Sequence, residues 1–151
     1  MIEPGEWTVV FSPHAANWFF RIIALGRFKH VWAFAFLHEL KTWLIYDVQY
    51  GGTRITAFPD SEHSQSVITA MIEGCDLVTV KRQEGNSVSM RFGFFCVPAI
   101  KHLLGIKSHA LRPDSLLRCV VSMPGSVHHR RHGSEASTIQ FAAARPPSGA
   151  A

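Results

Sequence analysis

The stretch FKHVWAFAFL (residues 28–37) and the stretch WLIYDVQY (43–50), separated by the short polar segment HELK (38–41), decide the fold of this chain. Both apolar runs are rich in aromatic and β-branched residues, which favour β-strands. The pattern therefore predicts an antiparallel hairpin. If its loop is about four residues long, pleat parity puts Asp47 and Gln49 on one face, with His30 opposite or diagonal to Asp47.

Further elements are expected on both sides of this hairpin. Strands are predicted at residues 7–11, 53–58, 77–81 and 87–92. Helices are predicted at residues 15–25, 59–72, 97–104 and 113–121. Because single strands and hairpins alternate with helices, we expect an α+β fold in which a mainly antiparallel sheet is packed with three to four helices.

One domain is expected from the size of the chain. A length of 151 residues with 47% apolar residues suits a single core of ordinary dimensions. From Pro124 onward the sequence becomes rich in Gly, Ser, Pro and Ala. We therefore predict a domain over residues 1–123 and a flexible tail over residues 124–151, and we interpret the cluster HHRRH (128–132) as a solvated basic run.

Charge and hydropathy exclude several classes of partner. Of the formal net charge of +4, the tail carries +2, which leaves too little for a nucleic-acid-binding face, so nucleic acid is an unlikely partner. No apolar run approaches the roughly 18 to 20 uncharged residues that cross a bilayer, so no membrane span is expected. The first residues, MIEPGE, do not form a signal peptide, and the three cysteines, an odd number without a close pair, suit a reducing compartment. A cytoplasmic location is therefore predicted.

Cys96 is the strongest candidate for chemistry. It lies where an apolar run ends and a predicted helix begins, with Pro98 in the first turn and Gly105 at the far end. Free N–H groups and the positive dipole end of a helix stabilise a thiolate. The N–H of Cys96 itself could later hold the oxyanion that forms when the thiolate attacks a carbonyl group.

A cysteine nucleophile needs a base, and His30 is the histidine that a rigid strand would hold in place. The base needs an acceptor for its other ring nitrogen, and Asp47 on the paired strand can supply one. A carboxylate there would also raise the pKa of the imidazole and favour a thiolate–imidazolium pair. The expected catalytic residues are Cys96, His30 and Asp47.

Three segments together resemble a known class of protein: FKHVWAF (28–34), WLIYD (43–47) and FFCVPAIKHLLGI (94–106). They look like short phage- and prophage-encoded proteins of the circularly permuted NlpC/P60, papain-like class, over roughly residues 7–120. In that class the base strand, the orienter strand and the nucleophile follow one another in this order. The resemblance implies a permuted papain-like fold and a cysteine peptidase or amidase that cuts peptide bonds of bacterial peptidoglycan without a metal or cofactor. The unpermuted family favours His, Asn or Gln as orienter, so this role stays open between Asp47 and Gln49.

Structural explanations compete with each of these roles. A cysteine among phenylalanines is often a buried apolar residue, a histidine on an apolar strand often belongs to the core, and Asp47 could merely close a strand. A zinc site is not expected, because the cysteines lack short paired spacing. We therefore predict a cysteine hydrolase, with acyl transfer left open. The alternative is a non-catalytic phage structural or adaptor module with a degenerate papain-like fold.

Overall fold

The computed structural model describes residues 4–14, 26–49, 52–83 and 96–129. The strands are β1 (Glu6–Ser12), β2 (His30–Leu37), β3 (Thr42–Gln49), β4 (Gly52–Pro59), β5 (Asp76–Lys81) and β6 (Val127–His129). The helices are α2 (Glu62–Ile72), α3 (Cys96–Leu104) and α4 (Pro113–Val121). The strands form one sheet in the order β4-β3-β2-β1-β5-β6, with every neighbouring pair antiparallel. The predicted α+β class with an antiparallel sheet is confirmed.

The predicted hairpin at the centre of the sheet is also confirmed. Strand β2 pairs with β3 in a register that places Leu37 opposite Thr42 and Ala33 opposite Tyr46. The turn closes at Lys41, which adopts a positive φ of 45°. If the same register is continued toward the start of β2, His30 falls opposite Gln49, and Asp47 is its diagonal neighbour.

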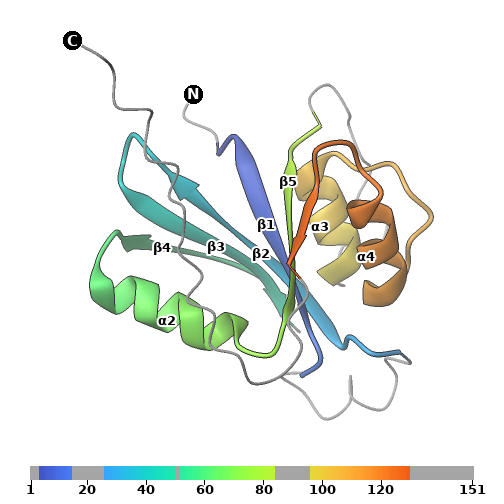
Figure 1. Cartoon of the computed structure of the whole chain (residues 1–151), viewed down its shortest axis with the longest axis horizontal. Helices are drawn as coiled ribbons and strands as arrows, with labels where there is room; N and C mark the ends of the chain where they lie inside the picture. Colours follow the sequence, from blue (N-terminus) through green and yellow to red (C-terminus); the bar gives the residue numbers. More distant parts are fainter. Residues whose placement is uncertain (1–3, 15–25, 50–51, 84–95, 130–151) are drawn as a thin grey trace.

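Alternation along the strands gives the sheet two apolar faces, and helices cover both. One face packs against α3 and α4 through Val9, Phe11, Val31, Ala33, Val78, Val80, Val97, Ile100, Leu104, Leu116 and Val120. The other face packs against α2 through Val10, Trp32, Phe34, Trp43, Ile45, Ile68, Ile72 and Leu77. In Figure 1, α2 and the pair α3 and α4 accordingly lie on different sides of the strands.

The helix boundaries follow from local signals in the sequence. Helix α2 begins one residue after Ser61, whose hydroxyl accepts a hydrogen bond from the backbone N–H of Ser64. Helix α4 begins at Pro113, as predicted. The predicted helix at residues 15–25 and the predicted strand at 87–92 lie outside the described residues. None of the helices in the described part of the chain is long and apolar enough to cross a membrane.

The boundary between domain and tail differs from the prediction. A flexible tail was expected from residue 124, but residues 127–129 form β6, which pairs with β5 so that Leu77 lies opposite His129. The edge of β5 offers unpaired backbone groups, and backbone pairing does not depend on apolar side chains. All three residues of β6 are exposed, which explains why composition alone did not reveal the strand. Residues 130–151 lie outside the described part.

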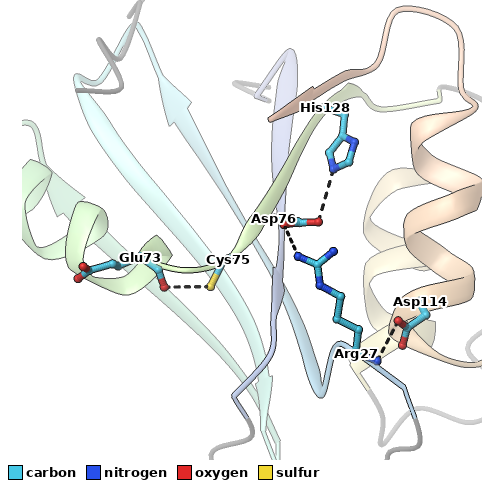
Figure 2. A network of polar contacts seen from close by, with 6 residues as sticks. All are labelled: Arg27, Glu73, Cys75, Asp76, Asp114 and His128. Atoms are coloured by element: carbon cyan, nitrogen blue, oxygen red, sulfur yellow. Dashed lines mark hydrogen bonds and ion pairs between the residues drawn. The ribbon is translucent and has the colours of Figure 1, made fainter. Parts of the chain in front are cut away.

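A polar network around the buried Asp76 connects β5 with β6 and, through Arg27, with α4. Asp76 at the start of β5 is 1% exposed, and its Oδ1 lies 3.3 Å from Nη2 of Arg27. Its Oδ2 lies 3.7 Å from Nε2 of His128 on β6. The backbone N–H of Arg27 donates to Oδ1 of Asp114 in the first turn of α4, at 3.1 Å. Figure 2 shows how Arg27 lies between the two carboxylates, so that it connects the sheet with α4.

Candidate active site

Cys96 is the first residue of α3, and its side chain is half-buried against the core beneath α3 and α4. The helix is held in place because Val97, Ile100 and Leu104 are buried. No acidic residue lies in its first turn, so no carboxylate of the helix itself neutralises the positive end of the dipole. The first backbone N–H groups of α3 have no partner within the helix, and Cys96 lies at this end.

His30, at the start of β2, and Asp47, near the end of β3, form a direct hydrogen bond. Nε2 of His30 lies 2.7 Å from Oδ1 of Asp47. The exposed fractions of the two side chains are 21% and 17%, so the pair is shielded from water on most sides and remains accessible. Strands β2 and β3 are neighbours in the sheet, which brings the two side chains within reach of each other.

His30 also contacts Cys96, which connects β2 to the start of α3. Burial lowers the pKa of His30, but hydrogen bonds to the side chains of Asp47 and Cys96, together with electrostatic interactions with the same two residues, outweigh burial and raise it from 6.5 to about 9. The imidazole is therefore protonated at neutral pH. Because Nε2 is bonded to Asp47, Nδ1 is the ring nitrogen left for the sulfur.

Gln49 completes the surroundings of the Asp47 carboxylate. Its side-chain amide donates to Oδ2 of Asp47 at 2.7 Å. Burial raises the pKa of Asp47, but hydrogen bonds from His30 and Gln49 outweigh burial and hold it below its ordinary value of 3.8. The carboxylate is therefore charged at neutral pH and can balance the charge of the imidazolium.

The structure thus brings together the three residues that the sequence singled out. Asp47 contacts His30 directly, whereas Gln49 contacts Asp47, which favours Asp47 as the orienter. The supporting role of Gln49 was missed, although its two-residue spacing from Asp47 on one strand was the signal for it. Cys75 is buried, and Cys119 is a half-buried residue of α4. In the described ranges, no three His, Cys, Asp or Glu side chains gather closely enough to hold a metal ion.

These contacts give the site the parts that nucleophilic catalysis needs. A sulfur at a helix N-terminus touches a protonated imidazole, and the imidazole is fixed by a charged carboxylate. No family model, curated protein or solved structure matches the chain. The function must therefore be inferred from the geometry of these residues.

Proposed function

We propose that this protein is a cysteine hydrolase that cleaves an amide bond. Cys96 is the nucleophile, His30 the general acid and base, and Asp47 the residue that orients the imidazole. The single observation that carries the proposal is the continuous chain of side-chain contacts from Cys96 through His30 to Asp47. The three residues come from α3, β2 and β3, so the fold itself assembles them.

The reaction follows from these contacts. The Cys96 thiolate attacks the amide carbon, and a C–S bond forms while the carbonyl oxygen takes up negative charge. Backbone N–H groups at the start of α3 stabilise that oxyanion. His30 gives its proton to the leaving nitrogen, and the C–N bond breaks. Water then attacks the acyl-enzyme, neutral His30 takes a proton from it, and the C–S bond breaks to restore the thiolate–imidazolium pair.

The order of the residues along the chain supports a more specific proposal. Base, orienter and nucleophile follow one another as His30, Asp47 and Cys96, which is the order of the circularly permuted NlpC/P60, papain-like class. On this basis we propose a permuted papain-like fold and a peptide of bacterial peptidoglycan as the substrate. A phage-encoded enzyme of this kind would act from the host cytoplasm or from the virion. None of the steps above needs a metal or cofactor.

Thiol reactivity tests the catalytic site without knowledge of the substrate. The purified protein is treated with iodoacetamide at pH 6.5, and peptide mapping follows Cys96 and Cys119 in the same molecule. A free thiol is mostly protonated at this pH, whereas a thiolate held by an imidazolium reacts readily. We expect Cys96 to be alkylated at least about tenfold faster than Cys119, and His30→Gln to remove most of this difference.

Activity on the proposed substrate is tested with purified peptidoglycan. The wild type should release new amino termini, detected by mass spectrometry, and Cys96→Ala should release none. Cys119→Ala is the matched control, because it removes a half-buried cysteine that does not contact His30. If Cys96 reacts no faster than Cys119 and no amino termini appear, the protein is a non-catalytic structural or adaptor module instead.

A further inference from the structure

Arg54 lies directly beside the proposed catalytic residues on the edge strand of the sheet. In the β3–β4 ladder, Arg54 is the partner of Asp47. Residues directly opposite in an antiparallel pair project from the same face, with Cβ atoms about 4.5–5.5 Å apart. The Arg54 side chain therefore emerges on the face from which Asp47 reaches His30.

The guanidinium of Arg54 is not used by the protein itself. Both oxygens of Asp47 are occupied, Oδ1 by His30 and Oδ2 by Gln49. The Arg54 side chain is exposed and forms no ion pair or hydrogen bond with any residue in the part of the chain that the structure describes. A cation opposite a carboxylate would ordinarily pair with it, and here each carboxylate oxygen is already hydrogen-bonded to another side chain.

The charge around this guanidinium favours an anionic ligand. Asp47 is the only acidic residue of β2, β3 and β4, and its two oxygens are hydrogen-bonded to His30 and Gln49. Arg54 is thus a cation without a carboxylate partner on these strands. A guanidinium presents paired N–H donors whose geometry matches a carboxylate.

We propose that Arg54 is a specificity residue that binds a carboxylate on the leaving-amine side of the scissile amide. This inference rests on the proposed function, because it takes Cys96 as the nucleophile. His30 must lie against the leaving nitrogen to protonate it. Cys96 lies at the start of α3, and the neighbouring strands β2, β3 and β4 carry His30, Asp47 and Arg54 in that order. The part of the substrate that extends past the imidazole, away from the sulfur, therefore approaches Arg54. The substrate class is an amide whose amine half is an amino acid with a free carboxylate.

A pair of alkylating probes tests this proposal without the natural substrate. N-iodoacetylglycine carries a carboxylate, and N-iodoacetylglycinamide is its neutral counterpart; each forms a C–S bond with Cys96 and releases iodide. The measured quantity is the ratio of the two alkylation rates at Cys96, obtained by peptide mapping. Because the guanidinium is exposed, its pairing with a carboxylate is weak, and we expect Arg54→Gln to lower the ratio about two- to fivefold. Arg54→Lys should retain part of the effect.

Lys107→Gln is the matched control, since Lys107 is an exposed cation in the segment beyond the far end of α3 from Cys96. An unchanged ratio in Arg54→Gln, or an equal fall in Lys107→Gln, would overturn the role of Arg54 and leave the proposed function intact. The proposed function itself fails if Cys96 reacts with the neutral probe no faster than Cys119 does. That outcome overturns both proposals.

Discussion

Gln49 donates a hydrogen bond of 2.7 Å to Oδ2 of Asp47, the carboxylate oxygen that His30 does not use. The carboxylate is therefore held from two sides and cannot rotate away from the imidazole without breaking one of these bonds. A carboxylate hydrogen-bonded to one ring nitrogen of a histidine keeps the imidazole in one orientation and one tautomer. Asp47 thus holds the His30 imidazole, and Gln49 holds the Asp47 carboxylate.

Asp47→Ala should slow alkylation of Cys96 by iodoacetamide about tenfold or more at pH 6.5, because the imidazole loses both its acceptor and the charge that keeps it protonated. Asp47→Asn keeps an acceptor oxygen and should give an intermediate rate. Gln49→Leu should change the rate by less than about threefold, since Asp47 still reaches His30. If Gln49→Leu were the more damaging change, Gln49 would be the orienter.

The ring of His30 should titrate near pH 9. NMR of the imidazole signals measures this midpoint, and His30→Gln identifies the signal among the nine histidines of the chain. In Asp47→Ala the midpoint should fall, because the main contact that raises it is lost. A wild-type midpoint at or below the ordinary value of 6.5 would contradict the thiolate–imidazolium pair.

The raised pKa of His30 also links protonation to stability. The folded protein binds this proton more tightly than the unfolded chain, so the stabilisation is fully present below pH 6.5 and is lost as the pH rises through about 9. In a Cys96→Ala background, where this thiol does not titrate, the protein with His30 should lose more free energy of unfolding between pH 6.5 and 9.5 than the same protein with His30→Gln. Urea unfolding at both pH values checks this. Equal losses in the two proteins would show that the histidine carries no such linkage.

The central hairpin and three of the four expected helices could be predicted from the sequence because their signals are local. Runs of aromatic and β-branched residues define β2 and β3, and Pro113 marks the start of α4. The contact between His30 and Asp47 followed from one further assumption, the loop length, which fixes the register of the pair. Cys96 entered as a candidate through its position at the start of a helix.

The features that escaped prediction depend on residues distant in the sequence. Strand β6 forms because β5 offers an open edge, and the sequence of three exposed residues carries no sign of it. From the sequence alone, Arg54 is an ordinary exposed residue of a strand. Only the β3–β4 register shows that it lies opposite Asp47. Arg27 precedes β2, Asp76 lies on β5 and Asp114 lies on α4. Because the three residues are far apart in the sequence, no local pattern predicts the contacts between them.

Arg27→Met should lower the free energy of unfolding by about 2–3 kcal/mol, because it leaves the buried Asp76 carboxylate without its cation. Methionine preserves apolar contact with Phe28, over whose ring the guanidinium lies. The double variant Arg27→Met, Asp76→Asn should recover part of the loss, since the uncompensated charge is gone. Arg118→Met, at an exposed position of α4, is the control and should stay within about 0.5 kcal/mol of the wild type. A similar effect in both single variants would refute a special role for the Arg27–Asp76 pair.

Gly26→Ala should destabilise the protein for two separable reasons. Gly26 has a φ of 125°, which L-residues rarely adopt, and a Cβ atom there would collide with Oδ2 of Asp114. We expect a loss of about 2–3 kcal/mol in urea unfolding, part from backbone strain and part from displacement of the carboxylate that accepts the Arg27 N–H.

A double-mutant cycle with Asp114→Ala separates the two causes of the Gly26→Ala loss. In that background the carboxylate is absent, so the cost of Gly26→Ala should fall by about 1 kcal/mol or more and leave the backbone strain alone. Gly125→Ala provides the reference for strain without collision, because Gly125 has a φ of 73° and no atom within 4 Å of the added Cβ. If the cost of Gly26→Ala were the same with and without the Asp114 carboxylate, the close approach of α4 to residue 26 would contribute nothing to it.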